Sequence, residues 1–482
     1  MNVKRFINQL TPLLLILSLF IVCSLKREKN RPNQPPDSKT VTIDGTKEFQ
    51  TIEGLGGTEM YLFPTSEEYY SRFFDDLGVS MVRFRMVEYT ESPRGGNADE
   101  ARDNDDADPL YINWNNVATA FLRPGTIANY LQAAQRGGCK IIGDIMSYPL
   151  WMKTNGAVNG GSLRAGYEDE AVEFILIWIK GLELFSGVHI DFVSLGNEPE
   201  WEHPYEGTVL SQAQMIAMIK KLGARLAADG LTTQIIAPET MDLAGIYGGY
   251  GNAIGSDVQA LGYLHAFAAH PYNGGGPFFN PDDGIPSYQA VKAYVDGKER
   301  PFWMTEYCLA ASGIGQKGTW NEAIHLVQHL HNALNYGWAT TWLYHELYND
   351  PSNTPIALID RDNPAAGETI YAKFYALKQY FRYIRPGAVR IDARCSDHNI
   401  LVTAFSHKTD RTLTIVAINR NSTDESLAGN ISGLKDLPDL SVVRTSQNEN
   451  AVNLGVVPVR GNTFSITLAA HSITTFIGKV SP

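Results

Sequence analysis

Short apolar runs alternate with longer amphipathic ones between about residues 51 and 385. The short runs predict eight buried β-strands, at Thr51–Gly56, Ser80–Met86, Cys139–Met146, Phe192–Leu195, Thr233–Ala237, Ala266–His270, Pro301–Thr305 and Ala339–Tyr344. Helical segments fall between these runs, which is typical of βα units with a parallel sheet. Eight such units predict an α/β fold, the (β/α)8 TIM barrel, which takes roughly 250 residues and more when its loops carry insertions.

One helical segment is especially well marked, between Ser211 and Asp229. Ser211 and Gln214 have the spacing of a capping box, in which each side chain satisfies a backbone group of the other residue. Gly230 follows and can end the helix. The apolar positions recur at helical spacing and form one face, made of Met215, Met218, Leu222 and Leu226. The sequence therefore predicts an amphipathic helix at this place.

The pattern changes near residue 386. Apolar and polar residues alternate in Ile400–Phe405, Thr412–Ile418, Leu440–Arg444 and Thr463–Leu468, with turn residues between them and no helical pattern. This alternation predicts a side antiparallel β-sandwich domain at 386–482. The barrel is assigned to 41–385, and the segment Lys39–Phe49 has an alternation that can add a strand to the β-domain.

The beginning of the chain has the features of a targeting segment. Basic residues precede an apolar run at 13–22 that is too short to span a bilayer comfortably, and Cys23 follows at once. We therefore predict a signal peptide at 1–22 and a polar, proline-containing tether at 23–40. The position of Cys23 resembles that of the acylated cysteine of bacterial lipoproteins, so lipidation is expected there, with an ordinary membrane anchor as the alternative. Export follows, to the periplasm, the cell surface or the medium.

Composition and charge narrow the classes of partner. Hydrophobic residues make up 44% and charged residues 19% of the 482 residues, which indicates a globular protein. The formal net charge is −12, so the chain has no excess of cations to neutralise phosphates, and we expect no nucleic-acid partner. A monomer is expected.

Candidate metal ligands are few. The cysteines beyond Cys23 have no close spacing, which excludes a disulfide framework and a cysteine zinc site: they are Cys139, Cys308 and Cys395. His325 and His329 are four residues apart on one helix, but a polar helix face is the preferred interpretation. The acidic segment Asp99–Asp108 could bind calcium, although a solvated loop is preferred. We predict no metal and no cofactor.

Polar and aromatic residues collect where the predicted strands end. Active sites of (β/α)8 barrels are built at the carboxyl ends of the strands, so these residues are the candidates for chemistry. They are Arg83, Trp151, Asn197, Glu198, Glu239, His270, Tyr272, Glu306, Trp342, Tyr344, His345 and Glu346. So many carboxylates, amides and rings on one rim are not explained by packing.

Two of these carboxylates are singled out by position. Glu198 ends strand four and Glu306 ends strand seven, on opposite sides of a barrel. Either one alone could be a solvated loop carboxylate or a helix cap, but the pair at matched strand ends indicates catalysis. Hydrolysis of a glycoside with retention needs two carboxyl groups roughly 5 Å apart, one as nucleophile and one as acid and base.

Several segments carry a resemblance to one family. They read QTIEGLGG at 50–57, SYPLWMKTNG at 147–156, LGNEP at 195–199, WMTE at 303–306 and IRPGAVR at 384–390. In this order they resemble glycoside hydrolase family 30, whose members are retaining barrels with a side β-domain. The similarity extends from about residue 50 to the C-terminus.

The resemblance implies a role for each matching residue. Glu198 is then the acid and base, Glu306 the nucleophile, and Asn197 the group that binds the sugar hydroxyl next to the anomeric carbon. Arg83 and Tyr272 are implied to hydrogen-bond the nucleophile. Trp151 and Trp342 are implied to form aromatic walls, and His270 belongs to the same supporting cluster.

The resemblance leaves the substrate open. It implies a β-linked polysaccharide, oligosaccharide or glycolipid, and the family's substrates include xylan, β-1,6-glucan, β-1,6-galactan and glucosylceramide. An endo-acting β-glycanase is our first hypothesis, and an exo-acting, glucosylceramidase-like β-glycosidase is the second. A non-catalytic carbohydrate-binding barrel is the alternative from another class, and transfer of the sugar in place of hydrolysis also stays open.

Overall fold

A computed structural model describes residues 38–59, 66–86, 112, 114, 127–272, 280–309, 318–349, 356–360, 369–435, 437 and 439–480. The predicted signal peptide, Cys23, most of the tether and the acidic segment Asp99–Asp108 lie outside these residues. In the described ranges, no helix has both the length and the apolar character needed to cross a bilayer.

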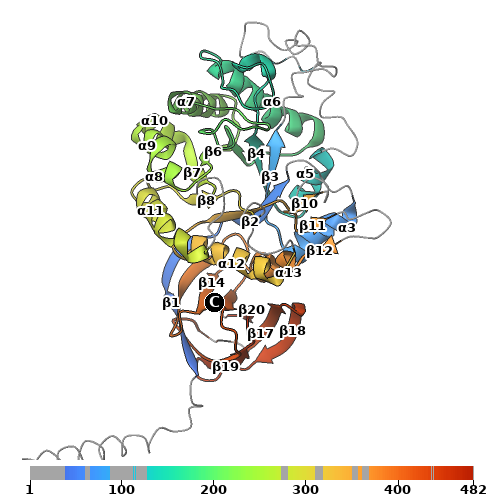
Figure 1. Cartoon of the computed structure of the whole chain (residues 1–482), viewed down its shortest axis with the longest axis vertical. Helices are drawn as coiled ribbons and strands as arrows, with labels where there is room; N and C mark the ends of the chain where they lie inside the picture. The colour runs from blue at the N-terminus through green and yellow to red at the C-terminus, as the bar shows by residue number, and fades with distance from the viewer. Residues whose placement is uncertain are drawn as a thin grey trace, which may run out of the picture.

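All eight predicted strands form, and they close into one parallel barrel (Figure 1). Their bounds are β2 Gly54–Glu59, β3 Met81–Met86, β4 Lys140–Ile145, β5 Phe192–Ser194, β6 Gln234–Thr240, β7 Leu264–Ala269, β8 Phe302–Met304 and β9 Thr341–His345. Pairing of β2 with β9 completes the closure. The predicted (β/α)8 fold is confirmed.

The inside of the barrel is filled by alternate residues of its strands. The inward-facing cluster consists of Met81, Ile142, Phe192, Ile236, Ala266, Ala268, Trp303 and Leu343. Successive residues of a strand point to opposite faces, so a residue two positions along the strand from any of these also points into the barrel, and the residues between them point outward. At the lower end, Glu53 accepts hydrogen bonds from Trp303 Nε1 (3.0 Å) and Thr340 Oγ1 (2.7 Å), and its carboxylate lies 2.7 Å from His265 Nε2.

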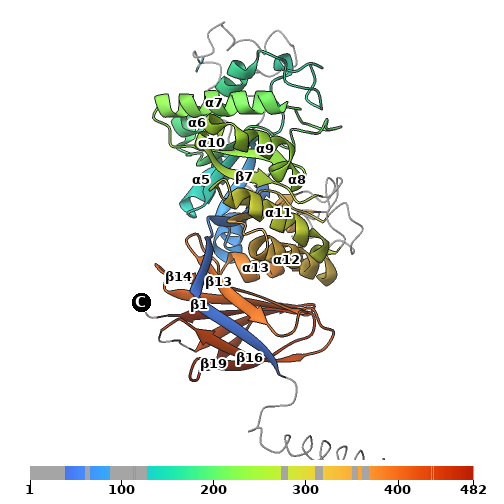
Figure 2. The same ribbon diagram turned by 90° about the vertical axis from the view of Figure 1, so that its left-hand side faces the viewer.

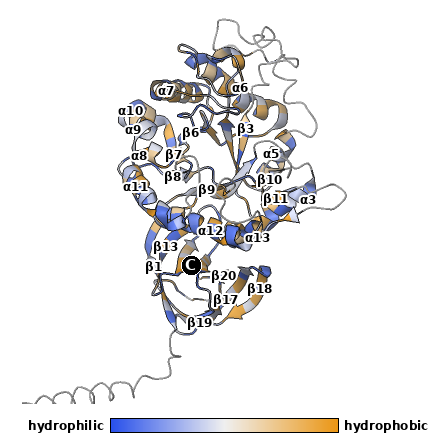
Figure 3. Ribbon diagram, viewed as in Figure 1, coloured by the Kyte–Doolittle hydropathy of each residue, from blue (hydrophilic) through white to orange (hydrophobic). Residues whose placement is uncertain are grey.

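Helices surround the barrel and carry both hydrophilic and hydrophobic positions (Figure 3). The α-helices are α3 Glu67–Tyr70, α5 Ile127–Arg136, α6 Glu168–Ser186, α7 Gln212–Ala228, α8 Ala244–Tyr247, α9 Gly249–Ser256, α10 Val258–Tyr263, α11 Ile285–Asp296, α12 Trp320–Asn335 and α13 Ala372–Phe381. A π-helical segment covers Ser71–Leu77, and 3-10 turns cover Leu150–Met152 and Pro281–Gly284. The capping box predicted for α7 is present at Ser211 and Gln214.

The C-terminal domain is a nine-stranded, mostly antiparallel sheet that folds over its own apolar core. Its strands are β13 Val389–Cys395, β14 Ile400–His407, β15 Thr412–Asn419, β16 Glu425–Ser432, β17 Leu440–Ser446, β18 Glu449–Val457, β19 Thr463–Leu468 and β20 Ser472–Lys479, together with β1 Lys39–Thr51. Figure 2 shows β1 running along the domain toward the barrel, antiparallel to β13 and parallel to β16. Three two-residue strands, β10 Tyr348–Asn349, β11 Ile359–Asp360 and β12 Thr369–Ile370, form a small separate sheet.

Helices α12 and α13 lie between the barrel and the β-domain (Figure 1). Trp320 at the start of α12 donates its indole N–H to the carbonyl of His471 (2.8 Å), and Asn335 at its end donates to Thr403 Oγ1 (2.8 Å). His329 and His331 are buried in this layer, so the expectation that His329 lies on a polar helix face was wrong, whereas His325 is partly exposed. The side of α12 that reaches solvent carries Asn321, His325 and Gln328 instead. Burial accordingly lowers the pKa of His331 to about 3, with help from Arg390 and Arg420.

Candidate active site

Arg83 is the centre of the site at the carboxyl ends of the barrel strands. On β3, Met81 points inward, so Arg83 two residues later points inward as well and is fully buried. Its Nη1 donates to Glu306 Oε2 (3.0 Å), and its Nη2 donates to Asn197 Oδ1 (2.7 Å) and Glu239 Oε2 (2.9 Å). Asp144 Oδ2 of β4 lies 3.0 Å from the same nitrogen. One guanidinium therefore fixes side chains from four other strand ends.

Glu198 and Glu306 face each other across the mouth of the barrel. One oxygen of each carboxyl group and one ring nitrogen of His270 all lie within 4.8 Å of one another. Glu198 is 4% exposed and Glu306 is 9% exposed, so both lie at the floor of the mouth. This separation agrees with the roughly 5 Å of double-displacement glycosidases and is shorter than the roughly 6.5–9.5 Å of inverting ones.

Glu306 is held in its ionised form. Burial by itself raises the pKa of a carboxyl group, but His345, His270 and Arg83 outweigh burial and lower the pKa of Glu306 to about 2. Burial lowers the pKa of His345 itself, so Arg83 and His270 are the cations that remain near neutral pH. The hydroxyl of Tyr272 donates to Glu306 Oε1 (3.3 Å). The carboxylate is both charged and oriented.

Glu198 lies in a different environment, between two histidines. His270 Nδ1 is 2.9 Å from Glu198 Oε1, and His203 Nδ1 is 3.8 Å from Glu198 Oε2. Burial lowers the pKa of His270, but Glu306, Glu198 and Glu239 overcome burial and raise it to about 10. His270 is therefore an imidazolium that donates to Glu198. Burial lowers the pKa of His203, which stays neutral at pH 7.

Within the described residues, one group could hold a metal ion by distance alone, namely Glu198, His270 and Glu306. A histidine must lose its proton to become a metal ligand. The three surrounding carboxylates keep His270 protonated, and its Nδ1 is engaged by Glu198. The donor set fits a hydrogen-bonded acid–base site better than a metal site.

Comparison with known families agrees with this arrangement. Residues 61–345 match O-Glycosyl hydrolase family 30, and residues 387–476 match the Glycosyl hydrolase family 30 beta sandwich domain. The chain belongs to glycoside hydrolase family 30. The expected resemblance is thereby confirmed for the barrel and for the side domain.

The similar proteins carry the names of different enzymes. The chain is 28% identical over 295 residues to Glucuronoxylanase XynC of Bacillus subtilis (strain 168), which covers 61% of this chain and 62% of the relative. It is 24% identical over 425 residues to Putative glucosylceramidase 1 of Caenorhabditis elegans, covering 81% and 77%. The match thus spans about three-fifths of the length of the glucuronoxylanase.

Solved structures show the same fold. The family 30 subfamily 8 xylanase Xyn30A of Clostridium acetobutylicum superposes with a TM-score of 0.71 at 20% identity, covering 91% of this chain and 99% of that one. The endo-β-1,6-glucanase BT3312 superposes with a TM-score of 0.67 at 18% identity, covering 94% and 97%. At these identities the comparison supports the two-domain architecture and not a substrate.

The structure brings most of the expected family 30 site residues together, with Trp342 as the exception. Leu343 points into the barrel, so Trp342 points outward, where it is fully buried and its ring centroid is 6.1 Å from that of Phe381 of α13. The expected aromatic wall at Trp342 was therefore wrong. Strand parity instead brings His345 to the site, with its Nδ1 2.7 Å from Thr58 Oγ1 and 3.9 Å from Glu306 Oε2.

Trp151 is half-buried on the 3-10 turn after β4. The ring contact that the structure shows for it is edge-to-face with Tyr167, at 5.7 Å between centroids. It packs onto the loop beside the mouth, and an aromatic wall at Trp151 stays a prediction.

Sequence reasoning missed three residues that contact the core of the site: Thr58, Asp144 and His203. Asp144 is two residues after Ile142 on β4, so strand alternation places it in the site once the structure shows that Ile142 points inward. Burial raises the pKa of Asp144 to about 7 although Arg83 opposes the change. Thr58 follows the same alternation on β2, but His203 lies in an irregular loop and gave no such signal.

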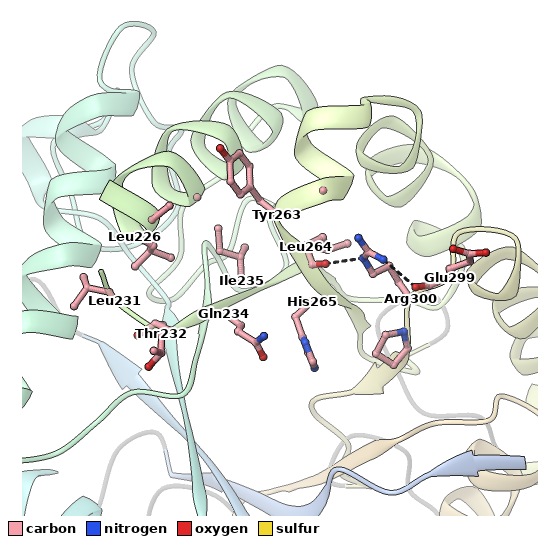
Figure 4. A pocket seen from close by; sticks show the side chains of 15 residues that line it. Leu226, Leu231, Thr232, Gln234, Ile235, Tyr263, Leu264, His265, Glu299 and Arg300 are labelled. Atoms are coloured by element: carbon pink, nitrogen blue, oxygen red, sulfur yellow. Dashed lines mark hydrogen bonds between the residues drawn. The ribbon is translucent and has the colours of Figure 1, made fainter. Parts of the chain in front are cut away.

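A separate cavity of about 500 Å³ lies at the opposite end of the barrel (Figure 4). It is lined by the amino ends of β6 and β7 and by neighbouring helices, with Ile235, Tyr263 and His265 among its residues. Arg300 beside it donates to the carbonyls of Leu264 (2.7 Å) and Glu299 (3.0 Å). This end of a (β/α)8 barrel usually serves stability, so the cavity is not the catalytic site.

Proposed function

We propose that this protein is an exported glycoside hydrolase that cleaves β-glycosidic bonds by double displacement, with Glu306 as nucleophile and Glu198 as acid and base. The observation that carries the proposal is the pair itself, two carboxyl groups that place one oxygen each within 4.8 Å across the barrel mouth. The environments of the two groups differ, because Arg83 and Tyr272 contact Glu306 while His203 and His270 contact Glu198.

The two steps follow from these contacts. Glu306 attacks the anomeric carbon and forms a glycosyl ester, while Glu198 gives its proton to the departing oxygen. Water then enters, Glu198 takes a proton from it, and the resulting hydroxide displaces Glu306. Asn197 Oδ1 is occupied by Arg83, so its amide N–H groups are the ones that can donate to the sugar hydroxyl beside the reacting carbon.

The proposed substrate is an internal bond of a β-linked glycan. The relatives named for xylan and for β-1,6-glucan support an endo-acting enzyme, and these two polymers are our first candidates. An exo-acting β-glycosidase is the second candidate, supported by the relative named as a glucosylceramidase, whose match covers 81% of the chain. A carbohydrate-binding barrel without catalysis is disfavoured by the presence of both carboxylates.

Export and lipidation belong to the proposal and rest on the N-terminal sequence. In a bacterial host, mature protein carrying acyl chains on Cys23 should partition into the membrane fraction, whereas Cys23→Ser should be released. Mass spectrometry of the mature N-terminus checks this directly. An unmodified N-terminus at another residue would contradict lipidation and leave the enzymatic proposal intact.

The decisive experiment is product profiling of residues 24–482 on xylan, β-1,6-glucan and glucosylceramide, with Glu306→Gln beside the wild type. A ladder of oligosaccharides from one polymer supports endo action, and monosaccharide alone supports exo action. Proton NMR of the earliest product should show the β-anomer. An inverted first product, or undiminished activity of Glu306→Gln, would remove the assigned roles.

A further inference from the structure

Three aromatic side chains form a cluster in the loop that follows Glu198. The ring centroids of Trp201 and His203 are 4.5 Å apart, those of His203 and Tyr205 are 4.8 Å apart, and those of Trp201 and Tyr205 are 5.8 Å apart. Trp201 is 36% exposed and Tyr205 is 41% exposed, whereas His203 is 2% exposed. Large aromatic surface left in water is unfavourable for folding alone, so this cluster calls for another explanation.

The buried member of the cluster connects the two exposed rings with the acid and base. His203 Nδ1 lies 3.8 Å from Glu198 Oε2, and the backbone N–H of Trp201 donates to the carbonyl of Glu198 (3.1 Å). Gly207 is needed beside the imidazole, because a Cβ at Gly207 would lie 2.3 Å from the ring of His203. The aromatic pair is therefore placed on the Glu198 side of the site and not on the Glu306 side.

The loop that carries the pair is fixed by the loop after β4. The N–H of Gly160 donates to the carbonyl of Tyr205 (3.2 Å), and Asn159 and Glu206 form an antiparallel bridge. Lys153, which is fully buried, donates from its Nζ to the carbonyl of Gly207 (2.8 Å). Arg85 of β3 forms an ion pair with Glu206. Two exposed rings on so rigid a frame lose little entropy when a ligand stacks on them.

From this placement we infer that Trp201 and Tyr205 form a stacking platform for the leaving-group sugar. The inference rests on the proposed function, because it uses Glu198 as the proton donor. The departing oxygen takes its proton from Glu198, so the sugar bonded to that oxygen lies on the Glu198 side of the scissile bond. Aromatic rings bind the apolar faces of pyranoses by dispersion and burial. The platform therefore favours glycans that continue past the cleaved bond on the leaving-group side, as the substrates of an endo-acting enzyme do.

The test separates substrates with and without a leaving-group sugar. We compare three variants with wild type, namely Trp201→Ala, Tyr205→Ala and Trp201→Phe. One set of substrates consists of reducing-end-labelled β-1,4-xylohexaose and β-1,6-glucohexaose. The other set consists of the corresponding disaccharyl β-fluorides, in which the leaving group is fluoride and has no sugar ring that could stack on the platform. Tyr263→Ala is the control, because it removes a partly buried tyrosine at the opposite end of the barrel.

We expect each alanine variant to lower kcat/KM on the cleaved hexasaccharide about tenfold and to change which bond is cut. Turnover of the fluoride should stay within about twofold of wild type, and Trp201→Phe should recover most of the loss. Tyr263→Ala should behave as wild type. Equal losses on hexasaccharide and fluoride would show a structural role and overturn the inference, as would unchanged kinetics on both.

Binding gives a readout that does not depend on turnover. Glu306→Gln is titrated calorimetrically with each hexasaccharide, with and without Trp201→Ala, and the alanine should weaken binding about tenfold. If the platform variants bind as tightly as the parent while wild type is active, the platform is refuted and the proposed function stands. If wild type hydrolyses neither hexasaccharide nor fluoride, the proposed function fails first.

Discussion

Replacing Glu306 with glutamine should destabilise the folded protein at neutral pH. The common expectation for a catalytic residue is the opposite, because active sites often carry strained or repelling groups whose removal stabilises the fold. Here the carboxylate has strong native partners. The pKa of Glu306 falls from its ordinary 4.5 to about 2, which means that the folded state favours the ionised form.

The size of the effect follows from linkage. One pH unit is worth about 1.36 kcal/mol, so the depressed pKa corresponds to at most about 3 kcal/mol of stability at pH 7, because His345, one of the groups that lower it, is uncharged there. Because the folded pKa is lowered, this contribution is complete above pH 4.5 and is lost as the pH falls through about 2. It should amount to about 2 kcal/mol at pH 3.5. Glutamine keeps the shape of the side chain and removes the charge.

Chemical denaturation is the suitable assay. At roughly 2 cal/mol/K of unfolding entropy per residue, a chain of this size shifts its melting temperature by only about one degree per kcal/mol. Urea unfolding followed by tryptophan fluorescence, at pH 7 and at pH 3.5, measures the difference directly. Glu48→Gln is the matched control, because Glu48 forms an exposed ion pair with Lys408 and should change stability by less than about 1 kcal/mol.

Two results would refute this reasoning. A Glu306→Gln variant as stable as wild type at pH 7 would show that Arg83 and His270 do not stabilise the ionised carboxylate. A stability difference that is the same at both pH values would show that the loss comes from packing and not from charge.

Three further outcomes are expected. Tyr272→Phe removes the hydroxyl that donates to Glu306 (3.3 Å) and accepts from the backbone N–H of Cys308 (3.2 Å). We therefore expect kcat/KM to fall about tenfold and the free energy of unfolding to fall by about 1–2 kcal/mol, and a wild-type rate would contradict the contact with Glu306. Lys153→Met removes the ammonium group that donates to Ser147 Oγ and to the carbonyl oxygens of Val158 and Gly207. The free energy of unfolding measured in urea should therefore fall by about 2–4 kcal/mol. Lys153→Arg keeps the positive charge and tests whether the charge alone is sufficient for stability. Chelation with EDTA should leave hydrolysis unchanged, and a loss reversed by calcium would direct attention to Asp99–Asp108.

The barrel was predictable because its signals are local. Each strand is a short apolar run buried on both faces, and each helix between them has its own periodicity, so both can be found without knowing what they contact. The helix α7 shows this most clearly, since its capping box and apolar face are complete within Ser211–Asp229. In the β-domain the alternation located β14, β15, β17 and β19, but not β13, β16, β18 or β20. Strand β20 is buried at most positions because it lies between β15 and β17 and also contacts α13, as in the hydrogen bond from Thr475 Oγ1 to the carbonyl of Gln379 (2.9 Å).

The sequence by itself determined the two carboxylates and their place at strand ends, because strand order and motif spacing are written along the chain. Only the tertiary structure decided which neighbours they have. Trp342 and His345 are three residues apart on one strand, and the register of β9 turns the first toward α13 and the second toward Glu306. A strand shows its alternation in the sequence but not which of its two faces lies inside, and that choice is made by closure of the barrel.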